Sequence, residues 1–472
     1  MAGSVSTTPG YELQPSAKQI ATQANYITDF NFMQTELPEL YEKEFARYGD
    51  RTIASFLRGM KSEMPFASDL IKWTEQGRLH TAYVNCESDA AAGSHTATIT
   101  VNDTITGGIA IRAGQTIMIN SAAGASNKAG VMEVDLAAGT FDVAYYATGG
   151  QTYATGDVLS MFIYGSEFRK GTGGMKGSLE AETNIFENSA IILKDHYEVA
   201  GSDMAQIGWV EVEDGNGGTG YLWYMKSKGD TRTRFEEYLE TSGIEAVPAE
   251  TGSGIRTQTA NTDLGDKGSD GLLYSIGKRG NIWAGGNPET LPEFDEVVAR
   301  LDKQGKISQN MLFINRKFDT DIDDMLATLN GYNGTGAANS ASFGAFENSD
   351  KMALNLGFTG FRRSGYDFYK TSWKYLNDPT MRGSLTTGGI NGVLVPAGTK
   401  SVYDQVAAKN MKRPFLHCRY RKSSTEDRKL KTWVIGSAGG ASNSDKDAME
   451  VHWLSERMLC TLGANNFFKF NQ

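Results

Sequence analysis

One stretch decides the fold: residues 290–329, TLPEFDEVVARLDKQGKISQNMLFINRKFDTDIDDMLATL, place two helical patterns around a short apolar run. Thr290 and Glu293 make a capping box, the signature of a helix N-terminus. Helical spacing then recurs at Phe294, Val297, Val298 and Leu301. Residues 311–314, MLFI, are typical of a buried strand. A second helix, begun by Asp319, is expected to place Ile322, Met325, Leu326 and Leu329 on one face. The pattern predicts an α/β region.

Strands and one long helix are expected on either side of this region. Residues 392–396, residues 431–436 and a last pair near residues 449–470 are typical of strands. Residues 221–241 have the spacing of a helix, about 30 Å long at about 1.5 Å per residue. Its apolar side would hold Leu222, Met225, Phe235, Tyr238 and Leu239. Gly229 lowers the helical propensity of this segment.

Residues 80–165 change to the period of strands. Apolar side chains recur at every second position in Ile99/Val101, Ile109/Ile111, Ile117/Ile119, Met132/Val134/Leu136 and Phe141/Val143/Tyr145. Gly-rich turns separate these runs. The pattern predicts a small all-β module.

Two segments lack the apolar anchors of a core. Residues 1–35 are rich in Ser, Thr, Gln and Ala and are expected to form an extended arm, with short amphipathic helices at 37–48 and 53–57. Residues 165–184, GSEFRKGTGGMKGSLEAETN, are rich in glycine and are expected to form a projecting, flexible loop. Both segments suit contacts with a neighbouring molecule.

The composition indicates a folded protein with much β-structure. Of 472 residues, 40% are hydrophobic and 22% charged, and 54 Gly against 10 Pro favours many tight turns. The net charge of −10 argues against a protein whose main task is to grip phosphate. Cys86, Cys418 and Cys460 lack metal-ligand spacing and suit buried thiols in a reducing cytoplasm. Neither secretion nor membrane insertion is expected.

No stretch carries a chemical signature that outweighs a structural explanation. Residues 319–324, DTDIDD, lack the Gly and the distal Glu of a calcium loop, so helix capping and dipole complementation explain them better. Residues 171–177 have the wrong glycine offsets for a dinucleotide loop, and residues 271–278 lack the spacing of a phosphate loop. The histidines are scattered at positions 80, 95, 196, 417 and 452. We expect no enzyme activity, no cofactor and no metal.

Three stretches carry a resemblance to a known family. They are residues 68–78 (SDLIKWTEQGR), 156–172 (GDVLSMFIYGSEFRKGT) and 182–209 (ETNIFENSAIILKDHYEVAGSDMAQIGW). Together with the order of elements, they resemble the major capsid proteins of tailed bacteriophages with the Hong Kong 97-like fold, especially those of crAss-like phages. The resemblance covers nearly the whole chain.

The resemblance implies an α+β capsid fold with a defined division of the chain. Residues 1–60 would be the N-terminal arm, 61–79 the start of the peripheral domain and 80–164 an inserted all-β domain. Residues 165–190 would be the extended loop, 191–269 the peripheral domain with its long spine helix, 270–405 the axial domain and 406–472 the C-terminal strands.

The same resemblance implies that the chain assembles with itself as hexamers and pentamers into an icosahedral head around double-stranded DNA. Assembly would take place in the bacterial host cytoplasm, with portal, scaffolding and decoration proteins as partners and with no cofactor or membrane. Candidate inter-subunit contacts in the extended loop are Glu167, Arg169, Lys170, Lys176, Glu180 and Glu182. Some related shells cross-link a loop lysine to an asparagine, but solvated lysines are the favoured interpretation of Lys170 and Lys176.

Two other functions stay open. An encapsulin-like compartment would share the fold and enclose protein cargo, so absence of packaged DNA would favour it. A β-rich adhesin or fibre module could instead bind carbohydrate through Tyr145, Tyr146 and Tyr153, although sheet packing explains these tyrosines equally well.

Overall fold

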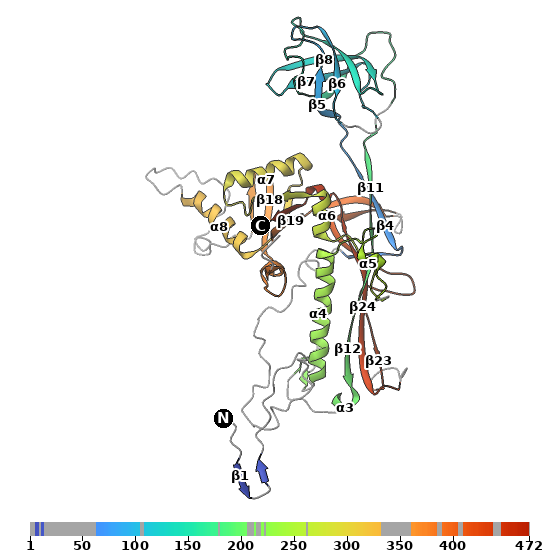
Figure 1. Cartoon of the computed structure of the whole chain (residues 1–472), viewed down its shortest axis with the longest axis vertical. Coiled ribbons are helices and arrows are strands. Elements are labelled where there is room, and N and C mark those ends of the chain that lie inside the picture. The colour runs from blue at the N-terminus through green and yellow to red at the C-terminus, as the bar shows by residue number, and fades with distance from the viewer. Residues whose placement is uncertain are drawn as a thin grey trace. The chain divides into compact units, whose positions relative to one another are not determined.

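The computed structural model describes residues 5–8, 11–13, 63–103, 108–177, 180–204, 212–213, 219–220, 223–260, 263–331, 360–384, 389–404, 409–437 and 445–471. The chain divides into two compact units, Asp69–Ser189 and the flanking pair Met1–Ser68 and Ala190–Gln472. The described elements of the first unit are all strands, whereas the second mixes helices and strands (Figure 1). The chain is therefore an α+β protein, as expected. The helical patterns at 37–48 and 53–57 lie outside the described residues.

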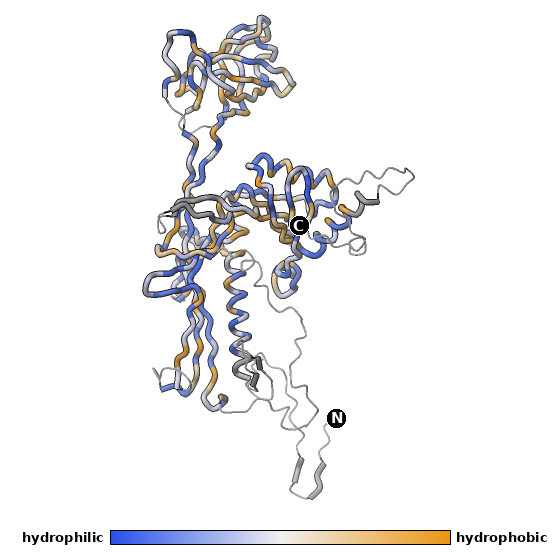
Figure 2. The backbone as a smooth tube through the Cα atoms, turned by 180° about the vertical axis from the view of Figure 1, so that it is seen from behind, coloured by the Kyte–Doolittle hydropathy of each residue, from blue (hydrophilic) through white to orange (hydrophobic). Residues whose placement is uncertain are grey.

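Six strands of the unit Asp69–Ser189 close into a barrel in the order β10-β5-β6-β9-β8-β7, with every neighbouring pair antiparallel. They are β5 Ala82–Ser88, β6 Thr96–Val101, β7 Gln115–Ser121, β8 Ser126–Asp135, β9 Thr140–Tyr145 and β10 Leu159–Ser166. Alternate side chains fill the barrel, so Ile117, Ile119 and Val143 are fully buried. Figure 2 shows hydrophobic and hydrophilic residues interspersed along the backbone of this barrel. The all-β module predicted from the alternation is confirmed.

Two of the expected apolar rows differ from the prediction. Met132 is 51% exposed and Leu136 is 45% exposed. Met132 follows the buried Val131, so ordinary alternation already places it outward, and the bulge between Val131 and Glu133 brings Val134 back toward the core. Leu136 lies beyond the end of β8. Ile109 and Ile111 are buried as expected, but they precede β7 and belong to no strand.

The same unit contains a two-stranded antiparallel ribbon of β4 Leu70–Gln76 and β11 Thr183–Ser189. Lys72 and Glu187 face each other across it, with 2.9 Å between Nζ and Oε2. The described part of the segment expected as an extended loop is therefore irregular between β10 and β11, at residues 167–177 and 180–182, and its last residues belong to a paired strand. The boundaries of 165–190 stay a prediction.

A five-stranded sheet in the flanking unit joins segments that lie far apart in the sequence. The order is β12-β24-β22-β3, and β23 also pairs with β24. The strands are β3 Glu63–Phe66, β12 Ile191–Ala200, β22 Leu416–Arg421, β23 Lys431–Ile435 and β24 Ala448–Thr461. Helix α4, Trp223–Glu245, runs along β12 and β24 (Figure 1). Its Phe235 and Leu239 share a core with Val451 and Trp453.

Helix α4 confirms the long helix predicted at residues 221–241, but it begins two residues later and ends four residues later. Phe235 and Leu239 are buried as expected. Tyr238 was wrongly placed on the apolar side, since it is 49% exposed. Leu222 and the Met225 side chain lie outside the described residues.

The second sheet of this unit has six strands in the order β15-β25-β19-β16-β18-β17. They are β15 Asn281–Trp283, β16 Gln309–Ile314, β17 Gly360–Arg363, β18 Tyr366–Ser372, β19 Ile390–Pro396 and β25 Phe468–Asn471. Leu312 and Leu394 share a core with helices α7 Leu291–Gln304 and α8 Arg316–Gly331. Phe313 and Val393 share another core with helix α6 Leu272–Arg279. Burial of both faces explains why these strands are apolar runs and not alternating sequences.

The two helices of the deciding stretch begin differently. Thr290 and Glu293 form the predicted capping box of α7, and Phe294, Val297, Val298 and Leu301 are buried along it. Helix α8 begins at Arg316, so the prediction that Asp319 begins it is wrong. The side chain of Asn315 caps it instead, because its Oδ1 accepts a hydrogen bond of 2.7 Å from the Phe318 N–H. Ile322, Met325 and Leu326 are buried as expected, and the Leu329 side chain lies outside the described residues.

The remaining elements are short. They are β1 Val5–Thr8, β2 Tyr11–Leu13, α3 Gly201–Met204, β13 Val212–Glu213, β14 Thr219–Gly220, α5 Gly254–Thr257, α9 Lys374–Asn377, β20 Thr399–Asp404, β21 Lys409–Pro414 and the 3-10 turns Arg382–Ser384 and Ala464–Asn466. The strands predicted at 392–396, 431–436 and near 449–470 correspond to β19, β23, β24 and β25.

Candidate functional site

The six residues predicted to contact a neighbour all have exposed side chains: Glu167, Arg169, Lys170, Lys176, Glu180 and Glu182. Glu167 accepts a hydrogen bond of 2.6 Å from the Tyr146 hydroxyl. This bond raises the pKa of Tyr146 to about 12. The backbone carbonyl of Glu182 accepts a bond of 2.7 Å from the Gly77 N–H, which closes the ribbon beyond β4 and β11. Their exposure suits a contact, but their role as one stays a prediction.

The β4–β11 ribbon presents apolar side chains to solvent. Ile185 is 66% exposed and Leu70 is 40% exposed. An isolated two-stranded ribbon is at best marginally stable in water, since it has no third strand and no core of its own. Exposed apolar residues on such a ribbon mark it as a surface that gains stability when another surface covers it.

A shallow groove of about 620 Å³ lies on the barrel at the Ser166 end of β10. Phe162, Tyr164 and Met175 line it and are 42–47% exposed. His80 and Gln115 complete its polar margin. Sequence reasoning missed this groove, although the alternation could have revealed it. Met161 lies inside the barrel, so the next residue, Phe162, must face outward.

The tyrosines considered for sugar stacking are mostly unavailable. Tyr145 is 9% exposed and Tyr153 is 1% exposed, and their hydroxyls lie 2.5 Å apart inside the barrel. Gln151 joins them by accepting a hydrogen bond of 3.1 Å from Tyr145. Only Tyr146, at 54%, is exposed. The suggestion that all three tyrosines form a carbohydrate-binding surface is therefore wrong.

Two carboxylates of the acidic run DTDIDD, residues 319–324, form ion pairs with a buried lysine. Lys370, whose side chain is 3% exposed, places Nζ 2.8 Å from Oδ1 of Asp319 and 2.5 Å from Oδ1 of Asp323. Asp321 accepts a hydrogen bond of 2.5 Å from Asn287. The interpretation as helix capping was incomplete, because two of these carboxylates balance the charge of a lysine on β18. Sequence offered no signal for this pairing across about fifty positions.

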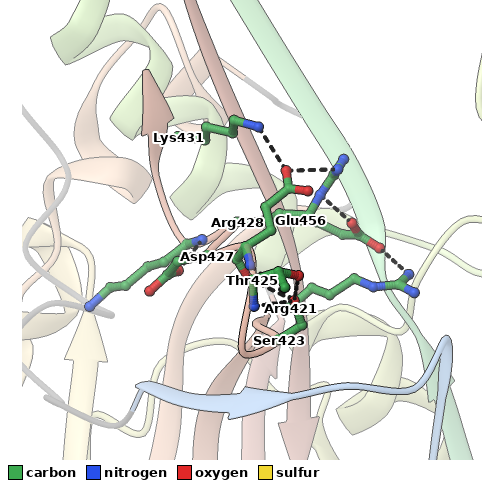
Figure 3. Close-up of polar contacts among 9 residues, drawn as sticks. Arg421, Ser423, Thr425, Asp427, Arg428, Lys431 and Glu456 are labelled. Atoms are coloured by element: carbon green, nitrogen blue, oxygen red, sulfur yellow. Dashed lines mark hydrogen bonds and ion pairs between the residues drawn. The ribbon is translucent and has the colours of Figure 1, made fainter. Parts of the chain in front are cut away.

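A second charged cluster fastens the loop between β22 and β23 to β24 (Figure 3). Glu456, whose side chain is 7% exposed, lies 2.8 Å from Arg421 and 2.7 Å from Arg428. Lys431, the first residue of β23, lies 2.8 Å from Glu426 on this loop. These ion pairs hold the loop in place, which is a structural role.

Glu245, the last residue of α4, links that helix to helix α9 and to the 3-10 turn Arg382–Ser384. The Arg382 guanidinium pairs with it, with 2.9 Å between Nη2 and Oε2, and the Tyr375 hydroxyl also donates to it. Burial alone would raise the pKa of Glu245, but the hydrogen bonds from Arg382 and Tyr375 outweigh it and lower the pKa. Burial raises the pKa of Tyr375, and its bond to Glu245 adds to that effect.

A hollow of about 610 Å³ lies at the N-terminal end of α7, within the flanking unit. Lys317 and Arg382 line it. Both cations already face carboxylates, since Lys317 lies 3.8 Å from Glu289 and Arg382 pairs with Glu245. The balance of charge makes this hollow a poor anion site.

The described residues hold no group of three or more His, Cys, Asp or Glu side chains that could bind a metal ion. His196 and His452 are not scattered as expected, because the pairing of β12 with β24 stacks their rings with centroids 5.9 Å apart. Cys86, Cys418 and Cys460 are buried thiols outside any disulfide, as predicted. Residues 271–278 form most of helix α6 and not a phosphate loop.

None of the described helices is long and apolar enough to cross a membrane.

No protein-family model matches the chain, and no curated relative matches it. Among solved structures, it is similar to one described as the capsid of a native GTA particle, at 10% identity and a TM-score of 0.37, covering 97% of this chain and 99% of that chain. A structure from Gordonia phage Cozz matches at 9% identity and a TM-score of 0.37, covering 96% and 99%. The SrpI encapsulin of Synechococcus elongatus matches at 11% identity and a TM-score of 0.33, covering 62% and 77%. Likenesses this weak fix neither the family nor the function.

Proposed function

We propose that the chain is a major capsid protein, the structural subunit of a virus shell and not an enzyme. It would assemble as hexamers and pentamers into the icosahedral head of a tailed phage, around double-stranded DNA. Support comes from the sequence resemblance to capsid proteins of the Hong Kong 97-like fold, and especially to crAss-like phages. In the same proposal, portal, scaffolding and decoration proteins are the partners, and the bacterial host cytoplasm is the site of assembly.

The observation that carries the proposal is the β4–β11 ribbon. Its exposed Ile185 and Leu70 gain burial only when another surface covers them. Subunits of a closed shell supply such surfaces to one another, because each patch meets a different patch on the next copy. The proposal therefore assigns the ribbon and the segment 167–182 to contacts between copies.

The net charge of the chain suits a shell that encloses DNA without binding it tightly. Tight binding to duplex DNA comes largely from Lys and Arg that neutralise phosphates. A chain with net charge −10 supplies no overall excess of such groups. The proposed shell would therefore enclose DNA without gripping it, so that the DNA can be packed and released.

Substitution on the ribbon tests the proposal. Ile185→Lys should leave the folded subunit intact, because the side chain is 66% exposed, yet should reduce the yield of closed particles in electron micrographs. Val247→Lys is the matched control, since Val247 is 58% exposed and lies outside the ribbon. Equal particle yields from both variants and the unaltered chain would show that the ribbon makes no contact needed for assembly. Particles that contain protein cargo and no DNA would favour the encapsulin-like compartment.

A further inference from the structure

We propose that the barrels of neighbouring copies bind head to tail. The acidic tip of one barrel, Val158 with Glu87 and Asp89, would seat on the aromatic groove of the next, lined by Phe162, Tyr164 and Met175. This inference rests on the proposed shell function, and it gives the inserted barrel a partner, namely a second copy of the chain.

The groove has the composition of a protein-binding surface. Tyr, Phe and Met are the side chains that protein interfaces favour, and here they stand 42–47% exposed around one hollow. Phe168, also 42% exposed, lies beside it with its ring against Gly114. Exposed aromatic residues gathered in this way indicate that a partner covers them.

Cations border the groove. The Lys128 Nζ lies 5.7 Å from the ring centroid of Tyr164, and Lys176 directly follows Met175. The Arg112 side chain lies next to Gly177, and His80 lines the groove itself. A partner that presents both an apolar and an acidic surface would complement these groups.

The other end of the same barrel provides that surface. Strand β10 runs from Leu159 to Ser166, and Val158, immediately before it, is 56% exposed. Glu87 ends up beside this tip, because Cys86 pairs with Leu159, and both Glu87 and Asp89 are exposed. Residues 81–111 contain Glu87, Asp89 and Asp103 and no Lys or Arg. The acidic tip therefore matches the cationic margin of the groove.

One barrel cannot satisfy its own groove. The tip lies before the start of β10 and the groove lies along its second half, from Phe162 to Ser166, so Val158 is roughly 13–26 Å from the groove residues of its own strand at about 3.3 Å per residue. Contact between unlike ends of identical subunits is heterologous, and such contacts close into rings when the rotation between copies allows it. Rings are the arrangement that the proposed hexamers and pentamers need.

Cysteine cross-linking of the full chain tests the contact. The three native cysteines are at most 5% exposed, so introduced cysteines should react selectively. In assembled particles, a chain carrying Val158→Cys and Met175→Cys should give a ladder of cross-linked copies after treatment with a short bismaleimide. Each single variant alone should stay monomeric on denaturing gels, and a mixture of the two should give dimers. Val158→Cys with Leu136→Cys is the matched control and should give no ladder.

Charge reversal provides the second measurement. Lys176→Glu and Glu87→Lys should each lower the cross-linking yield several-fold, and the two changes in one chain should restore it. Intact particles without a ladder would overturn this inference and leave the proposed function standing. Failure of the chain to form particles would overturn both. Binding of an acidic oligosaccharide to the groove, together with the absence of a cross-linked ladder, would overturn the inference and show that the groove has a different partner.

Discussion

The Nζ atom of Lys370 lies 2.8 Å from Oδ1 of Asp319, although only 3% of the lysine side chain is exposed. The ion pair joins strand β18 to helix α8, and Asp323 from the next turn of the helix completes it. A buried charge is tolerated when carboxylates face it, so the three side chains depend on one another.

Lys370→Met should therefore destabilise the protein strongly. It leaves Asp319 and Asp323 without the cation, and breaking a buried ion pair in this way costs about 3–5 kcal/mol. The measurement is urea-induced unfolding of the variant and the unaltered chain. Arg362→Ala is the control, because Arg362 pairs with Asp367 at 3.4 Å with 71% of its side chain exposed, and such a pair contributes about 0–1 kcal/mol. Equal losses in the two variants would contradict the account of Lys370.

The barrel should depend on its internal polar network. Gln151 accepts hydrogen bonds from Ser88 and Tyr145 and donates to the backbone of Ala90 and Tyr153. Gln151→Leu removes these four hydrogen bonds, at a cost of about 1–3 kcal/mol for each buried group that is left unsatisfied. Near-ultraviolet circular dichroism during heating should show an earlier loss of tertiary structure. Tyr146→Phe removes only an exposed bond to Glu167 and should change little.

The carboxylate of Glu245 should make the free energy of unfolding depend on pH in the acidic range. Arg382 and Tyr375 lower its pKa in the folded chain, so its contribution is present above the ordinary pKa of 4.5 and is lost as the pH falls through the lower folded value. Glu245→Gln should be less stable than the unaltered chain at neutral pH. The difference should shrink as the pH falls below about 4.5. Unfolding midpoints measured across this range check the sign, and a difference that is constant with pH would refute it.

The deciding stretch was predictable because its signals are local. The capping box of Thr290 and Glu293 involves neighbouring residues, and the run at residues 311–314 is apolar because both faces of β16 are buried. Helix α8 began earlier than predicted because Asn315 is also an effective cap, and it precedes the acidic run. Local rules identify the element more reliably than its first residue.

The contacts that were missed depend on pairing between distant segments. His196 and His452 stack only because β12 and β24 pair in one particular register, which the sequence does not specify. Lys370 and its two aspartates meet for the same reason. Tyr145 is a different case, because it shares the inward parity of Phe141 and Val143 and could have been assigned to the core. Met132 is a similar case, because it follows the inward-facing Val131, whereas the bulge after Val131 had no local signal.

Electron microscopy of the purified full chain shows whether it forms a shell. We expect closed icosahedral particles, or rings of five and six subunits, whose yield falls in the Ile185→Lys variant of the exposed ribbon. Monomers alone, persisting over a range of salt and protein concentrations, would contradict the assignment of the chain as a shell subunit.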